Sequence, residues 1–218
     1  MDVFYTYFLS QLILFPVIAG FFRYRLVQRE CSPFFWLLVL GLLCEEASFI
    51  FIENSHIKTN ALPTNIYILC EWILLAIQFH QWGFLKKKRK WFIALVIATV
   101  MVWVTENLIL HQINFFRPYF PFLYSFLVVI LSVREINFMI THENRMLFRN
   151  PKFLICIGLI IYFIYKIIFE WAYQMSLLNA SEFTQTIIFL FAYINAGTNI
   201  IFGIALLCIP GRKKFSLD

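Results

Sequence analysis

Seven apolar stretches, each as long as a membrane-crossing helix, constrain this chain more than any other feature of its sequence. They cover residues 3–22, 33–53, 65–84, 91–111, 118–140, 153–174 and 184–208. A bilayer-crossing helix needs about 20 mostly apolar residues. Within each stretch the apolar residues are continuous and do not alternate with polar ones, which argues against an outer-membrane barrel. The sequence therefore predicts an all-α polytopic membrane protein.

The composition leaves no room for a separate soluble domain. Hydrophobic residues make up 61% of the 218 residues and charged residues only 14%, whereas an ordinary soluble domain carries about 25% charged residues. The seven stretches use most of the chain and leave short connections. We therefore expect residues 1–218 to form a single seven-helix bundle. Pro16 lies inside the first stretch and is expected to kink its helix.

The distribution of basic residues predicts the orientation of the bundle. Of the 18 Lys and Arg residues, 14 lie in the segments that follow the first, third, fifth and seventh spans, and only Lys58 and Arg117 lie in the segments on the opposite side. Because Lys and Arg are enriched in cytoplasmic loops, we expect the N-terminus outside and the C-terminus in the cytoplasm. Anionic lipid headgroups at the cytoplasmic face are the expected partner of these segments, so the net charge of +6 requires no nucleic acid.

Ionisable residues inside the predicted spans are the main candidates for function, because each costs at least a few kcal/mol at membrane depth and usually faces the bundle interior. The spacing places Tyr67 on the helical face of Glu71, and Tyr162 on the face of Lys166. We expect a polar, acidic cavity in the outer half of the bundle, in which Lys166 pairs with Glu71 or with the adjacent Glu45 and Glu46. The predicted ligand or ion-pair network comprises Glu45, Glu46, Glu71, Lys166, Glu170, Tyr67 and Tyr162.

A second group of polar residues lies in the fifth and seventh spans. It comprises Arg134, Glu135, Asn137, Asn195 and Asn199. These side chains are candidates for a secondary polar network, but two structural alternatives stay open. Asparagine side chains often only hydrogen-bond neighbouring helices, and an arginine can extend to the membrane interface.

The sequence offers no set of residues typical of a metal, cofactor or nucleophile site. The four His residues lie in loops or near span ends, and no CxxC pair is present, so we expect neither a metal nor a cofactor. The favoured function is binding of a small polar or cationic ligand, or of protons, by a sensor or transporter. Two alternatives stay open: an intramembrane enzyme that uses a glutamate as general base on lipids, and a structural subunit whose charges pair with a protein partner or a second copy.

Three sequence segments carry a resemblance to known proteins. They are Glu45-Glu46, the run Asn65-Ile66-Tyr67 followed by Glu71, and the run Asn150-Pro151-Lys152-Phe153 followed by Gly158-Leu159-Ile160-Ile161-Tyr162. In these segments the chain resembles small uncharacterised bacterial inner-membrane proteins with seven helices. The resemblance implies a place in the bacterial inner (cytoplasmic) membrane and brings no activity with it.

Overall fold

The computed structural model describes residues 3–54, 61–83, 89–110, 113–115, 118–142, 147–176 and 182–210, and these contain helices and no strands. Six of the helical segments in this part of the chain are long and apolar enough to cross a membrane. They are α4 (Ser32–Asn54), α5 (Ala61–Trp82), α6 (Arg89–Val104) with its π-helical continuation η3 (Thr105–Ile109), α7 (Tyr119–His142), α8 (Pro151–Ser176) and α9 (Glu182–Leu207). The chain is thus an all-helical, polytopic protein of the membrane-integral type.

The first predicted span is divided into three short helical pieces. These are α1 (Val3–Ser10), the 3-10 turn η1 (Gln11–Ile13) and α2 (Leu14–Phe22), and the apolar part from Tyr7 to Phe22 is shorter than the other spans. Pro16 explains the break, because a proline has no N–H to bond the carbonyl four residues earlier. That carbonyl belongs to Leu12, which lies within η1. The irregularity expected from Pro16 therefore takes the form of a local change of helix type.

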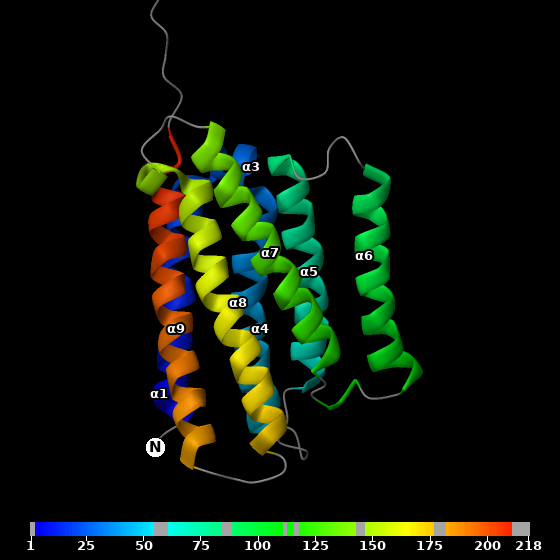
Figure 1. Ribbon diagram of the computed structural model, residues 1–218. Coiled ribbons are helices and arrows are strands. Elements are labelled where there is room, and N and C mark those ends of the chain that lie inside the picture. The colour runs from blue at the N-terminus through cyan, green and yellow to red at the C-terminus, as the bar shows by residue number, and fades with distance from the viewer. Residues whose placement is uncertain are drawn as a thin grey trace, which may run out of the picture.

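The helices form one bundle in which successive long helices run in opposite directions (Figure 1). Helix α9 packs against α8 on one side and against α1 and α2 on the other, α8 packs against α7, and α4 packs against α5. Helix α6 lies at the edge, where it contacts α5 and α7. Helices α2, α5, α7 and α9 finish at the same end of the bundle. We call it the basic end, because the described basic residues that follow α2, α5 and α7 lie there (Figure 1). Helix α1 begins at the opposite end (Figure 1).

Two short helices cover the basic end. Helix α3 (Tyr24–Glu30) follows α2, and η4 (Leu147–Arg149) precedes α8. Just before α3, the Arg23 guanidinium donates hydrogen bonds to the carbonyl of Ile209 at 2.7 Å and to that of Leu207. These carbonyls are at the end of α9, where a helix leaves carbonyls unpaired and favours positive charge. Arg23 therefore fastens the end of the last helix to the end of the first span.

The surface and the core are both apolar, as expected for a protein surrounded by lipid. Phe22 is 84% exposed and Trp91 is 71% exposed, whereas Trp72, Phe34 and Phe120 are fully buried. Glycine permits close aromatic packing in the interior: a Cβ on Gly158 of α8 would lie 2.4 Å from the Phe202 ring of α9. The ring occupies the space that any larger residue at this position would need.

Helix α6 is held at the edge of the bundle by two tryptophan hydrogen bonds. The Trp72 indole of α5 donates to the hydroxyl of Thr99 at 2.8 Å, and the Trp103 indole of α6 donates to the Asn65 carbonyl at 3.0 Å. The Asn65 side chain in turn donates to the carbonyls of Ile113 and Phe115 in the connection between α6 and α7. Both buried indole N–H groups thereby have acceptors, as buried polar groups require.

Candidate functional site

A buried ion pair joins α8 to α5 near the middle of the bundle. The Lys166 Nζ lies 3.0 Å from the Glu71 Oε2, and the two side chains are only 8% and 4% exposed. Tyr124 of α7 completes the arrangement, since its hydroxyl donates to the same carboxylate oxygen at 2.5 Å and accepts a hydrogen bond from the ammonium. One carboxylate therefore ties three helices together through charge-assisted hydrogen bonds, which are stronger than neutral ones.

The second oxygen of the carboxylate has its own donor. The Tyr67 hydroxyl donates to Glu71 Oε1 at 3.3 Å, from one turn earlier on α5. Aromatic rings enclose the ammonium: the Lys166 Nζ lies 5.0 Å from the ring centroid of Tyr124, 5.5 Å from that of Phe163 and 5.7 Å from that of Tyr162. The electron-rich faces of such rings attract cations, so the charge is balanced by the carboxylate and further stabilised by the rings.

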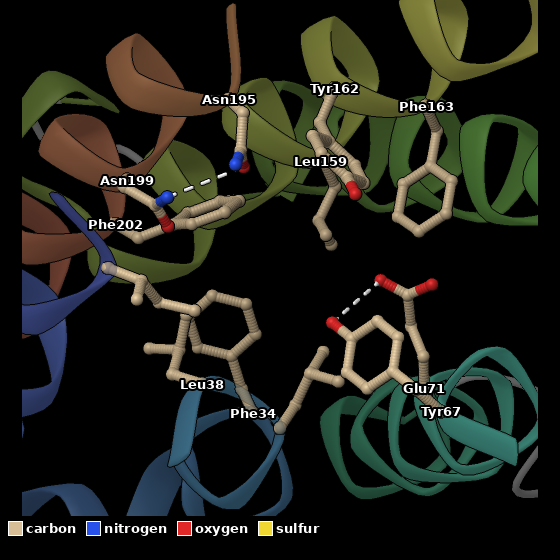
Figure 2. Close-up of a pocket in the computed structure, with 12 residues that line it drawn as sticks. Phe34, Leu38, Tyr67, Glu71, Leu159, Tyr162, Phe163, Asn195, Asn199 and Phe202 are labelled. Atoms are coloured by element: carbon tan, nitrogen blue, oxygen red, sulfur yellow. Dashed lines mark hydrogen bonds between the residues drawn. The ribbon is translucent and has the colours of Figure 1, made fainter. Parts of the chain in front are cut away.

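A small cavity borders this ion pair. Its volume is about 50 Å³, and its polar lining consists of Glu71, Tyr67, Tyr162, Asn195 and Asn199. The rest of the lining is apolar: Ile13, Phe34, Leu37, Leu38, Leu159, Phe163 and Phe202. Figure 2 shows Glu71 and Tyr67 on one side of the space and Tyr162 opposite them. The two asparagines of α9 lie on the side of Tyr162, farther from Glu71. A water molecule takes up about 30 Å³ in the liquid, so the cavity has room for about one or two water molecules.

Helical spacing explains how each helix presents its polar groups. Tyr67 and Glu71, Tyr162 and Lys166, and Asn195 and Asn199 are all separated by four residues, which places the members of each pair on one helix face. The Asn199 amide donates to the Asn195 Oδ1 at 3.4 Å. The Asn199 side chain is 3% exposed. The three pairs come from α5, α8 and α9, and each of their members except Lys166 lines the cavity.

The other predicted carboxylates lie away from the cavity lining. Glu46 of α4 accepts hydrogen bonds from the Tyr7 hydroxyl at 3.2 Å and from the Gln11 amide at 2.9 Å, and so faces the first span. Glu45 is half-buried and interacts electrostatically with Tyr67 and Tyr162. Glu170 is half-buried one turn after Lys166 on α8, toward the opposite end. The predicted acidic network thus reduces to one cavity-lining carboxylate.

The position of the cavity also differs from the prediction of an outer-half site. Glu71 lies halfway along α5 and Asn195 halfway along α9, and the lining continues to Phe34 in the first turn of α4 at the basic end. The cavity therefore extends from the middle of the bundle toward the basic end. The prediction followed the number of carboxylates expected in the outer half, but two of them, Glu46 and Glu106, accept hydrogen bonds from other parts of the bundle.

The predicted secondary network is divided between different parts of the bundle. Arg134 and Asn137 are exposed on α7, whereas Glu135 is buried on its inner side. Asn195 and Asn199 instead line the cavity with Glu71. The structure does not bring the α7 group and the α9 pair together, because residues 134 to 137 lie in the second half of α7, toward the basic end.

A larger groove of about 320 Å³ lies at the opposite end, beside η3. Its lining comprises Met101, Val102, Thr105, Glu106, Leu110 and Tyr119. The Glu106 carboxylate accepts the backbone N–H groups of Tyr119 at 3.2 Å and Phe120 at 2.9 Å, the first residues of α7. A negative charge at a helix N-terminus stabilises it, so Glu106 acts as a cap for α7.

Sequence reasoning missed two residues of structural importance. Tyr124 contacts both members of the ion pair. The sequence pattern that could have identified it is its spacing from Val128 and Leu131, which places all three on one buried face of α7. Arg23 was assigned only to membrane orientation, although it binds the end of α9. Among the described residues, no group of three His, Cys, Asp or Glu side chains is placed to hold a metal ion.

Comparison with protein-family models, with curated proteins and with solved structures gives no match.

Proposed function

We propose that this protein is a proton-responsive membrane protein, a sensor or transporter, in which Lys166 and Glu71 form the titrating centre. The observation that carries the proposal is a buried ion pair whose single carboxylate also borders a water-sized cavity. Water in such a cavity can bring protons to the pair and remove them. Tyr124 and Tyr67 hold the carboxylate in place from both sides.

The size of the cavity favours protons over an organic ligand. Binding sites for organic molecules commonly measure about 300–1,000 Å³, whereas this cavity measures about 50 Å³. The same comparison disfavours a lipid substrate in this cavity. In addition, both oxygens of Glu71 already accept hydrogen bonds, which leaves this carboxylate poorly suited to act as a general base on a substrate.

The ion pair is more costly than packing alone requires. Burying two charges removes them from water, and replacing a buried ion pair with apolar residues is often neutral or stabilising. Ionisable residues inside a membrane protein are usually retained for proton, ion or ligand handling. The pair of Lys166 and Glu71 fits that use, since both side chains are almost fully buried.

We place the protein in the bacterial inner membrane with seven spans, the N-terminus outside and the basic end in the cytoplasm. The support is that Arg25, Arg89, Arg149 and Lys152 all lie in segments at the basic end (Figure 1). The C-terminal tail after Pro210 lies outside the described residues. Single cysteines in a cysteine-free background test the orientation: Gln28→Cys should be protected from a membrane-impermeant maleimide in intact cells, and Asn114→Cys should react. The reverse pattern would overturn the orientation.

A pH titration of tryptophan fluorescence in detergent tests the proton-responsive centre. The Trp72 ring lies 6.3 Å from the Tyr124 ring, so a change in the pair should alter its emission. We expect a one-proton transition in the wild-type protein in choline chloride, its loss in Glu71→Gln and its retention in the control Glu46→Gln. Tyr124→Phe preserves the ring packing and should shift the transition. Identical titrations of folded wild type and Glu71→Gln would overturn the proposal.

A further inference from the structure

Two buried hydroxyl groups on α7 have no hydrogen-bond partner within the part of the chain that the structure describes. They are the Oγ atoms of Ser125 and Ser132, and both residues are fully buried. A buried polar group that makes no hydrogen bond costs free energy, and a water molecule that bonds several such groups is the common remedy in protein interiors. The two serines therefore indicate internal water beside this face of α7.

The two serines share a helical face with a buried carboxylate. Ser125 and Ser132 are seven residues apart, and Glu135 follows Ser132 by three, so the three side chains lie on one side of the helix. Glu135 is 9% exposed and lies in the half of α7 toward the basic end. At the other end of this face, Tyr124 is the neighbour of Ser125 and donates to the Glu71 carboxylate. The face thus connects the ion pair with a second buried carboxylate.

Helix α8 presents ionisable groups opposite this face of α7. The two helices lie side by side and run in opposite directions (Figure 1). Lys166 of α8 meets Tyr124, and ten residues earlier Cys156 interacts electrostatically with Glu135 and with Lys152. Ten residues correspond to about 15 Å along a helix. The two unpartnered hydroxyls lie within this interval between the charged groups.

The interval is short enough for a chain of water molecules. Ser125 and Ser132 are about 10 Å apart along α7 at 1.5 Å per residue, and about three hydrogen-bonded water molecules span that distance. Val128 lies between the two serines on the same face and is fully buried. Val128 is therefore the apolar constriction that such a chain must pass.

Glu170 continues the line of ionisable groups toward the opposite end of the bundle. It lies one turn after Lys166 on α8 and interacts electrostatically with Lys166 and with Glu106 at the end of α6. Together with Glu135 and the ion pair, it gives ionisable groups toward the basic end, in the middle and toward the opposite end. Chains of carboxylates inside the membrane relay protons in pumps and transporters.

We propose that the interface between α7 and α8 conducts protons across the bundle, with Glu135 as the group that exchanges them at the basic end. This inference rests on the proposed proton-responsive centre and selects a transporter over a sensor. Glu135 accepts a proton from water, forming an O–H bond with an electron pair of its carboxylate, and releases it to the next water. Each water and serine oxygen accepts one proton and releases another, Glu71 accepts the last, and Glu170 passes it toward the opposite end. Every group returns to its starting form, so one proton leaves for each that enters.

Glu135 is the carboxylate of this interface at the basic end. The other charged or titratable groups of the helices at this end are Cys156 and Lys152 on α8, His80 on α5, Arg89 and Lys90 on α6, Glu30 on α3 and Cys31 at the start of α4. Cys31 interacts electrostatically with Cys156 and with Glu30, and the His80 ring stacks on Phe92 of α6. The proposed exchange at this end therefore depends on Glu135.

Proton flux into liposomes tests the conduction. The purified full-length protein is reconstituted into liposomes that contain the pH-sensitive dye pyranine, and a potassium gradient with valinomycin makes the interior negative. We expect the interior to acidify faster than in protein-free liposomes. Glu135→Gln should lower the rate of acidification about a hundredfold, the low end for loss of a positioned proton-transfer group. Ser132→Ala should lower the rate about five- to tenfold, the equivalent of one lost hydrogen bond.

Two further variants on α7 localise the route. Val128→Ser places a third hydroxyl at the apolar constriction and should raise the rate of acidification. Thr141→Val is the control for Ser132→Ala, because Thr141 is exposed and its hydroxyl donates to the carbonyls of Asn137 and Phe138 in its own helix. Equal losses of flux in Ser132→Ala and Thr141→Val would overturn the assigned route.

The tryptophan titration in detergent separates this inference from the proposed function. Glu135→Gln should retain the pH-dependent transition, because residue 135 lies about 16 Å along α7 from the ion pair, and this retention also shows that the variant is folded. Ser132→Ala decides the question if Glu135→Gln does not fold.

Each outcome supports or overturns the inference. If the wild type shows the transition but acidifies liposomes no faster than the protein-free control, the conduction is refuted and the proton-responsive centre stands. The same conclusion follows if Glu135→Gln conducts at the wild-type rate, because protons would then reach the ion pair through the cavity. Flux that persists in Glu71→Gln would overturn the route, since it would bypass the ion pair. If folded wild-type protein shows neither transition nor flux, both proposals fail.

Discussion

The ion pair between Lys166 and Glu71 makes a quantitative prediction about stability. Lys166→Met preserves most of the side-chain volume and leaves the Glu71 carboxylate, 4% exposed, without its counter-ion. Breaking a buried pair in this way costs about 3–5 kcal/mol. Glu71→Gln alone should cost a similar amount, since it leaves the ammonium paired only with the Tyr124 hydroxyl. The double variant contains neither charge, so the two losses should not add, and we expect a coupling free energy of about 2–3 kcal/mol.

Reversible unfolding in mixed detergent micelles measures the four free energies of this cycle. The control cycle combines Lys166→Met with Glu46→Gln, because the Glu46 carboxylate bonds Tyr7 and Gln11 on the first span. Distant sites without shared partners usually add to within about 0.5 kcal/mol, and the control should do so. Additivity of this quality in the Glu71 cycle as well would refute the ion pair and with it the proposed titrating centre.

Three further predictions follow from the packing and from the basic end. Gly158→Ala should lower the midpoint of thermal unfolding, because the added Cβ would lie 2.4 Å from the Phe202 ring. Gly197→Ala is the control: a Cβ at this position would have no neighbouring atom within 4 Å, so the variant should unfold at the wild-type midpoint. Arg23→Gln should cost about 1.5–3 kcal/mol of the free energy of unfolding, the value for hydrogen bonds made by a charged group. The control is Arg25→Gln, whose side chain is exposed, and an equal loss in both variants would contradict the role of Arg23 at the end of α9. The Cys31 thiol should resist N-ethylmaleimide at pH 8 until the protein unfolds. Burial, aided by the neighbouring Glu30, raises the pKa of this thiol to about 12, and the reactive thiolate forms only near that pH. Rapid labelling of the folded protein would contradict this prediction.

The long helices were predictable because their signal is local. The stretch predicted at 118–140 is α7 at 119–142, and the stretch predicted at 153–174 is α8 at 151–176. The error at the start of α5 has a local cause: the helix begins at Ala61, before Pro63, since the first turn of a helix tolerates proline. The first span was harder, because Pro16 divides it and its continuous apolar part is short.

The site was only partly predictable, because helical periodicity gives the face of a residue but not the helix that this face meets. The spacing identified Tyr67 with Glu71 and Tyr162 with Lys166 as pairs on one face each. It could not decide which carboxylate meets Lys166, since Glu45 and Glu46 lie at comparable depth. The packing of α5 against α7, and of α7 against α8, makes that choice in favour of Glu71. The contribution of Tyr124 from α7 depends on the same packing.

The last prediction separates a functional ion pair from a structural one. If the pair exists for stability, replacing the whole polar group with apolar residues should be costly. If it exists for proton handling, the triple variant Lys166→Met, Glu71→Met, Tyr124→Phe should unfold within about 1 kcal/mol of the wild type or be more stable, because buried ion pairs gain little over well-packed apolar side chains. The same variant should lose the pH-dependent fluorescence transition completely. A loss of more than about 3 kcal/mol in the triple variant, comparable with breaking the pair, would make the group a structural element and would remove the energetic argument for its function.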